Sequence, residues 1–155
     1  SDLVFIMDNI IHYNYMAQGR SIKTAMRIMR KADKRLISKV HTALDNIGES
    51  TERIIYLSEL SAKPLYRFYA NQLKNYYDNN LQFQDIIKLI ITEIYGCFNP
   101  LFLNFILAEL PLWFHADCIL QQPHITLWYT KLSPNWHQLL SIYPNANIEI
   151  ILQEF

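Results

Sequence analysis

The residue types best suited to chemistry gather in the last third of the sequence. His115, Asp117 and Cys118 stand close together, and His124 and His137 follow. Imidazole and thiolate groups are typical zinc ligands, and a Cys–His pair can also provide an activated nucleophile. The intervals between these residues match no standard zinc finger, and no local signature of a cysteine enzyme surrounds them. We therefore expect packing roles for them, with no catalytic residue, no metal site and no cofactor.

His124 also begins a short motif, PHITL at residues 123–127, at the start of a predicted strand. The motif resembles one half of the 2H phosphoesterase family, in which two histidines flank a phosphodiester, one as acid and one as base. The upstream candidate is HTAL at residues 41–44, which has its hydroxyl residue one position early and falls in a predicted helix. The resemblance implies, as an alternative function, a 2H-type phosphodiesterase acting on RNA or nucleotide ends, with His124 as acid or base.

The net charge of zero conceals an asymmetry along the chain. Residues 1–39 hold eight Lys or Arg and three Asp, a net charge of +5, and residues 40–155 carry −5. Spacings of three and four residues place five of the basic residues on one face of a predicted helix: Lys23, Arg27, Arg30, Lys31 and Lys34. Such a face could pair with acids elsewhere in the chain, bind an acidic protein, or bind nucleic acid or an anionic membrane.

Aromatic residues are concentrated in the C-terminal half. Trp128 lies in a predicted strand and Trp136 in a predicted short helix. Tryptophan is a typical anchor of protein interfaces. We therefore add Trp128 and Trp136 to the candidate partner-binding residues, and the alternative is that both belong to the core.

Other sequence signatures of catalysis are absent. The three glycines, at positions 19, 48 and 96, are too far apart to form a phosphate-binding loop, and no GxSxG motif occurs. Hydrophobic residues make up 51% of the chain and charged residues 18%, so it can build a core and is not a disordered tail. Cys97 and Cys118 are too few for a disulfide framework, which favours an intracellular location. The frequent Ile, Asn, Lys and Tyr favour an AT-rich genome.

The elements that must position these residues are mainly helical. Apolar residues at helical spacing predict helices over residues 3–17, 21–47, 63–78, 83–96 and 100–110. Residues 53–58 fit a strand or the start of a helix. Strands are predicted over residues 124–130 and 147–155, with a short helix from 134 to 142 between them. Pro111 is expected to end the fifth helix, so the apolar stretch 86–120 is interpreted as two buried helices rather than a membrane span.

The sequence therefore predicts an α+β fold, mainly helical, with about five helices followed by a small C-terminal sheet of two or three strands. We expect a single domain over residues 1–155, helical to about residue 110 and α/β from about 111, excised from a longer chain. The predicted function is non-catalytic protein–protein interaction, as an adaptor or chaperone-like subunit of a bacterial secretion or effector system. The partner would present an acidic or apolar helix-binding surface, and an effector would act in the host cytosol. An enzyme is the less favoured interpretation.

Overall fold

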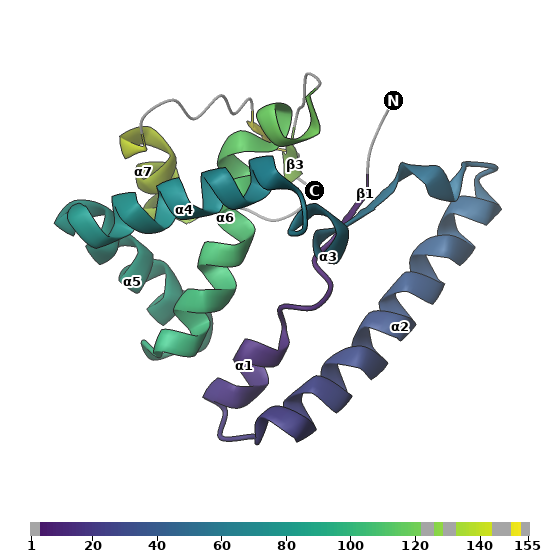
Figure 1. The fold of residues 1–155 in the computed structure, drawn as a ribbon, viewed down its shortest axis with the longest axis horizontal. Helices are drawn as coiled ribbons and strands as arrows, with labels where there is room; N and C mark the ends of the chain where they lie inside the picture. The colour runs from purple at the N-terminus through teal and green to yellow at the C-terminus, as the bar shows by residue number, and fades with distance from the viewer. Residues whose placement is uncertain (1–3, 122–125, 129–132, 144–149, 153–155) are drawn as a thin grey trace. The chain divides into compact units, whose positions relative to one another are not determined.

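The computed structural model describes residues 4–121, 126–128, 133–143 and 150–152, and most of them are helical (Figure 1). The chain forms two compact units, Ser1–Lys63 and Pro64–Phe155. The division expected near residue 110 falls inside a helix of the second unit. The single-domain organisation remains a prediction.

The first unit combines a long helix with a short pair of strands. β1 (Val4–Ile6) and β2 (Ile54–Tyr56) pair in parallel. The other elements of the unit are α1 (His12–Ala17), α2 (Ile22–Asn46), the 3₁₀ helix η1 (Thr51–Arg53) and α3 (Leu57–Leu60). Ile6, Leu44 and Ile54 pack together, so the strand pair and the last turns of α2 share one core.

The ends of α2 follow local signals in the sequence. Ser21 Oγ accepts a hydrogen bond of 3.3 Å from the amide of Thr24, which caps the first turn. At the other end, the amides of Gly48 and Glu49 bond to carbonyls of the last turn, with Gly48 at a φ of +71°. This pairing is the Schellman arrangement, which uses a left-handed residue to close a helix. The helix predicted over residues 21–47 is confirmed.

Replacing Gly48 with alanine should lower the free energy of unfolding by about 1 kcal/mol, because a Cβ is strained in the left-handed region. Apart from Gly48 and its two chain neighbours, no described atom lies within 4 Å of the position that this Cβ would occupy, so the cost arises from the backbone alone. Gly48→Asn is the matched control, since asparagine tolerates this conformation better and should lose less. Urea unfolding measures both variants, and an equal loss in the two would contradict the explanation.

The second unit is built on four described helices. They are α4 (Pro64–Asn79), α5 (Leu81–Tyr95), α6 (Pro100–Leu120) and α7 (Pro134–Ile142). α4 packs against α5 and α6, and α5 also packs against α6 and α7. β3 (Thr126–Trp128) and β4 (Ile150–Leu152) pair in parallel over three residues each. The most deeply buried side chains of the unit are Leu73, Phe83, Ile87, Ile90, Ile91, Leu110, Phe114 and Leu139.

α6 continues beyond the residue that was expected to end it. Asn99 caps the helix and Pro100 occupies its first turn, as predicted, but the helix passes Pro111 and ends at Leu120. The backbone departs from helical angles at His115, with φ −135° and ψ 23°, which marks a kink one turn after the proline. Nine side chains of α6 are buried, and this packing offsets the hydrogen bond that the proline removes. The expected end of this helix at Pro111 is therefore wrong, whereas the apolar stretch 86–120 does form two helices, α5 and α6.

By length and composition alone α6 could also cross a membrane, with a mean hydropathy of 1.3 over its most apolar stretch. Core helices of soluble proteins meet the same criteria. Tyr66 of α4 donates a hydrogen bond of 2.6 Å to the carbonyl of Ala108, in the turn before Pro111. This contact and the packing of α4 along α6 are those of a core helix.

The fold-class prediction is wrong. It placed the only sheet after five helices, whereas β1 and β2 pair at the N-terminal end, where a helix over residues 3–17 was expected. The described strands are three residues long, so the chain is mostly helical with minimal strand pairing. Short apolar runs fit a strand or a helix equally well, and here pairing with a segment about fifty residues away decides. The remainder of the predicted strands 124–130 and 147–155 lies outside the described residues.

Candidate functional site

The second unit contains a cavity of about 560 Å³ bounded by α4, the kinked end of α6 and the end of α7. One face of α4 supplies six of the lining residues: Phe68, Tyr69, Gln72, Asn75, Tyr76 and Asn79. His115 and Cys118 of α6 and Tyr143 at the end of α7 complete the lining. The apolar pattern of residues 63–78 predicts that Leu65, Phe68, Tyr69, Leu73 and Tyr76 are buried. Of these Leu73 is buried, and the other buried side chains of the helix are Tyr66 and Tyr77.

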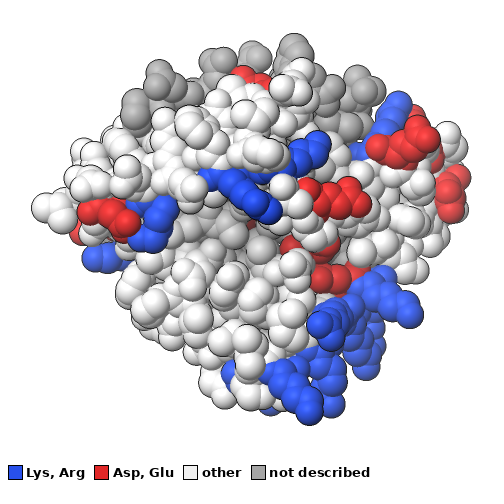
Figure 2. Space-filling view, in the orientation of Figure 1, with Lys and Arg blue, Asp and Glu red and all other residues white. Residues whose placement is uncertain are grey.

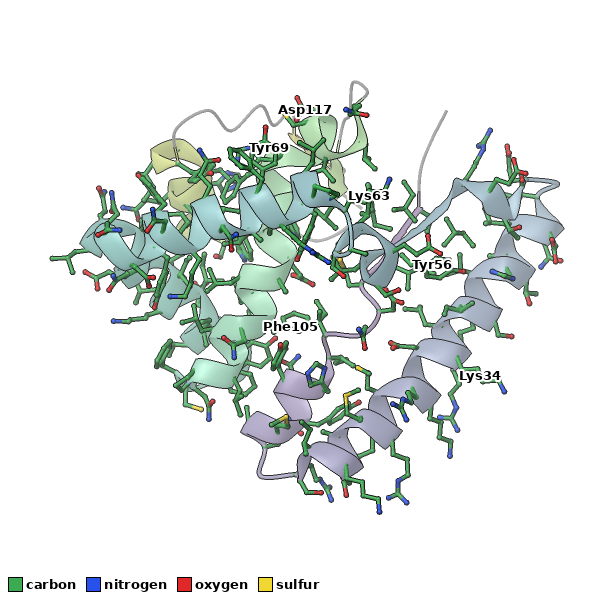
Figure 3. All side chains as sticks on the ribbon, in the orientation of Figure 1. Lys34, Tyr56, Lys63, Tyr69, Phe105 and Asp117 are labelled. Carbon is green, nitrogen blue, oxygen red and sulfur yellow. The ribbon has the colours of Figure 1, made fainter. Side chains whose placement is uncertain are left out.

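Three aromatic side chains form the inner wall of the cavity. Nε2 of His115 and the hydroxyl of Tyr143 are joined by a hydrogen bond of 2.7 Å, and both residues are buried. The ring of Tyr69 stacks on the imidazole, with centroids 4.0 Å apart and planes 19° apart. Figure 3 labels Tyr69 on α4 and Asp117 on the last turns of α6, at the same end of the unit. The kink in α6 therefore positions His115 between two tyrosines.

Burial keeps the inner wall uncharged near neutral pH. Burial lowers the pKa of His115, although the nearby Asp117 carboxylate opposes the shift. Burial raises the pKa of Tyr143 to about 12, with smaller contributions from Tyr76 and Tyr69. A hydrogen bond with the Cys118 thiol raises the pKa of Tyr69, and burial adds to the effect. The cavity therefore presents neutral hydrogen-bonding groups and aromatic faces.

The lowered pKa of His115 predicts a loss of stability in mild acid. The imidazole of the unfolded chain gains a proton as the pH falls below about 6.5, whereas the buried imidazole gains one only at lower pH. The free energy of unfolding should therefore fall with pH in this window, and His115→Gln should remove that part of the fall. Urea unfolding at two pH values on either side of about 6.5 measures the change. His137→Gln, at an exposed position on α7, is the control, and identical pH dependences in wild type and His115→Gln would contradict the assignment.

Glu109, on α6, is the second group of chemical interest. Burial raises the pKa of its carboxyl to about 7, and a hydrogen-bonding interaction with Trp113, one turn away, partly opposes the shift. A carboxyl with this pKa is populated in both protonation states near neutral pH, so it can act as a general base or a general acid. Glu109 is not among the described residues that line the cavity.

Sequence reasoning missed Glu109 as a functional residue. The signal that could have revealed it is a lone acid in a predicted helix that is apolar on nearly all sides. Burying a carboxylate without a partner is costly, so such a group tends to retain its proton and to have a raised pKa. Spacing motifs could not reveal it, because no second catalytic residue lies nearby in the sequence.

The basic face of α2 lies in the first unit. Lys23, Arg27, Arg30, Lys31 and Lys34 are all exposed, and Figure 2 shows Lys and Arg side chains gathered over this helix. Lys23, Arg27 and Arg30, with Thr24, line a hollow of about 360 Å³. None of the five forms an ion pair with another residue of the described ranges. The alternative that they pair with acids elsewhere in the chain therefore finds no support in this part of the protein.

The remaining sequence candidates are scattered. Trp136 is buried and stacks on Trp113, with ring centroids 5.3 Å apart. Trp128 belongs to β3, but its side chain lies outside the described part of the chain, as does all of His124. The partner-binding role of both tryptophans stays a prediction. Within the described ranges, no three His, Cys, Asp or Glu side chains lie close enough together to hold a metal ion.

Comparison with known proteins changes the functional interpretation. No protein-family model matches the chain. It is 25% identical over 142 residues to a cyclo(L-leucyl-L-phenylalanyl) synthase of Streptomyces noursei, a match that covers 83% of this chain and 59% of that protein. The chain thus spans about three fifths of the length of this relative.

Solved structures share the fold. The TM-score is 0.78 with a cyclodipeptide synthase from Bacillus thermoamylovorans, at 15% identity, over 96% of this chain and 72% of the other. It is 0.73 with a Mycobacterium tuberculosis protein, at 19% identity, over 88% of this chain and 62% of the other. That structure demonstrates that cyclodipeptide synthetases are related to type I tRNA synthetases.

These similarities overturn the predicted function. The relatives are synthases, which point to an enzyme and not to a non-catalytic adaptor or chaperone-like subunit. A protein as the main partner, a secretion or effector setting and the host cytosol have no support among them. The 2H interpretation also fails, because His41 lies on α2, hydrogen-bonded to Tyr56 at 3.3 Å, and not on the strand that the motif requires.

Proposed function

We propose that this chain is the greater part of a cyclodipeptide synthase that joins two aminoacyl groups carried by tRNA. The observation that carries the proposal is the 25% identity over 142 residues with a synthase that makes a cyclic dipeptide. The shared fold supports it, as does the relation of such enzymes to tRNA synthetases. Because tRNA is an intracellular molecule, the proposal agrees with the predicted intracellular location.

The reaction requires two proton transfers that a carboxyl can make. The amino nitrogen of one aminoacyl group attacks the ester carbonyl of the other, an amide bond forms, and the bond to the tRNA ribose oxygen breaks. A second, intramolecular attack closes the ring and releases the second tRNA. In each step the nitrogen loses a proton and the departing oxygen gains one, so the reaction balances without an oxidant or a nucleotide.

Glu109 is the described residue best suited to this exchange. Its carboxyl, with a pKa of about 7, can accept the proton of the attacking amine and return it to the leaving oxygen. Glu109 is partly buried in a largely apolar stretch of α6, so its interaction with charge that develops in the transition state is stronger than it would be in water. We assign Glu109 the role of general acid and base.

The basic face of α2 suits the tRNA backbone. Its exposed cations provide the positive charge that phosphates require, and the hollow lined by Lys23, Arg27 and Arg30 could seat a phosphate group. The helix carries no Phe, Tyr or Trp on which bases could stack, so it would contact the backbone and not read the bases.

Expression of the complete reading frame that encodes this chain in a bacterium tests the proposal. Mass spectrometry of the culture should detect cyclic dipeptides, and Glu109→Gln should reduce their yield by about 100-fold or more. Glu59→Gln, an exposed carboxyl on α3, is the matched control and should leave the yield unchanged. A soluble wild-type protein that produces no cyclic dipeptide would contradict the proposal.

A further inference from the structure

We propose that the cavity of the second unit binds a neutral cyclic dipeptide, at a site separate from the Glu109 carboxyl. The inference rests on the proposed function, because it takes the ligand from the product class of that reaction. It concerns the end of α6, where His115 at the kink and Cys118 line the space beside α4.

The shape and size of the cavity suit a small ring. Its volume of about 560 Å³ lies within the usual range of small-molecule sites. The stacked pair of Tyr69 and His115 forms one wall, and Phe68 stands at the mouth with 59% of its surface exposed. An aromatic side chain left in water beside a cavity gains contact area when a flat ligand covers it.

The polar groups of the rim suit an amide. A cyclic dipeptide presents two amide edges, each with one N–H donor and one carbonyl acceptor in fixed geometry. A carboxamide side chain offers the same pair and can match such an edge with two hydrogen bonds. Gln72, Asn75 and Asn79 bring three carboxamides to the rim, and Asn79 is held by a 2.7 Å hydrogen bond to the carbonyl of Asn75. Gln72 has no hydrogen-bond partner within the described part of the chain.

The charge of the lining selects against other ligands of the reaction. Among the described residues that line the cavity there is no Lys, Arg, Asp or Glu, and burial favours the neutral forms of His115 and Tyr143. A tRNA phosphate would lose its hydration there without an opposite charge among the lining side chains. A cyclic dipeptide carries no charge, so it loses little on entry.

Calorimetric titration of the full chain with cyclo(L-leucyl-L-phenylalanyl) tests the proposal. We expect one molecule bound per chain, and Phe68→Ala and Gln72→Ala should each weaken binding by about tenfold. Both side chains are exposed, so neither change threatens the core. Leu89→Ala, on α5 with 52% of the residue exposed and outside the cavity, is the control and should change the affinity less than about twofold.

Two further ligands distinguish the chemistry. The linear dipeptide Leu-Phe carries charged ends and should bind at least about tenfold more weakly. Uracil offers an amide edge without apolar side chains, and an affinity equal to that of the cyclic dipeptide would overturn the assignment in favour of a nucleobase site. Absence of binding, or an equal loss in Leu89→Ala and Phe68→Ala, would also overturn it. Cyclic dipeptide synthesis in cells is measured separately. If synthesis occurs but the titration detects no binding, the proposed site is wrong; if synthesis is absent, the proposed function is wrong.

Discussion

Replacing Glu109 with glutamine should raise the free energy of unfolding by roughly 3 kcal/mol at about pH 8, although it removes a charged group. Burial raises the pKa of this carboxyl from 4.5 to about 7, so the folded protein holds a proton that the unfolded chain has released. The sign follows from linkage: the wild-type protein gains stability as the pH falls from about 7 to 4.5, and above about 7 it retains a buried carboxylate at full cost. The neutral amide avoids that cost.

Urea unfolding of both proteins over this pH range measures the effect. The difference between Glu109→Gln and wild type should be largest above about pH 7 and shrink as the pH falls toward 4.5. Glu59→Gln, at an exposed position, is the control and should show no such trend. A variant that is more stable and yet inactive in synthesis would locate the carboxyl in the catalytic machinery, since functional sites retain groups that reduce stability. A variant less stable than wild type at high pH would contradict the assignment.

Reversing three charges on α2 should abolish most binding of tRNA. In the variant Lys23→Glu, Arg27→Glu, Arg30→Glu, three exposed cations become anions around the same hollow. Affinity for deacylated tRNA at low salt should fall by about 100-fold or more, because each phosphate contact contributes through release of counterions. The slope of log affinity against log salt concentration should also become shallower by about two to three units. Filter binding over a series of salt concentrations measures both quantities.

The matched control changes the same total charge elsewhere. Lys63, Lys74 and Lys88 are exposed and lie outside α2, so their joint replacement by glutamate tests whether the net charge alone decides binding. This control should lose much less affinity than the α2 variant. An equal loss in the two proteins, or tRNA binding by wild type that does not depend on salt, would contradict a specific role for the helix.

Local signals in the sequence are sufficient to predict α2. Ser21, Gly48 and the helical repeat between them are local signals, and the observed helix begins and ends where they predict. The basic face was also predictable, because a helix of known limits determines which side chains share a face. The burial of its apolar residues was less predictable. The helical repeat predicts Ile22 and Ile47 on the apolar face, yet they are 61% and 71% exposed.

Tertiary structure decided the features that depend on contacts between distant segments. β1 is a strand because β2 pairs with it, and α6 passes Pro111 because the burial of its side chains offsets the hydrogen bond lost with the missing amide. The cavity is of the same kind: Tyr69, His115 and Tyr143 are far apart in the chain, and only the packing of α4, α6 and α7 brings their rings together. The pKa of Glu109 likewise depends on how much water the packed helix excludes, a quantity that no local pattern of residues contains.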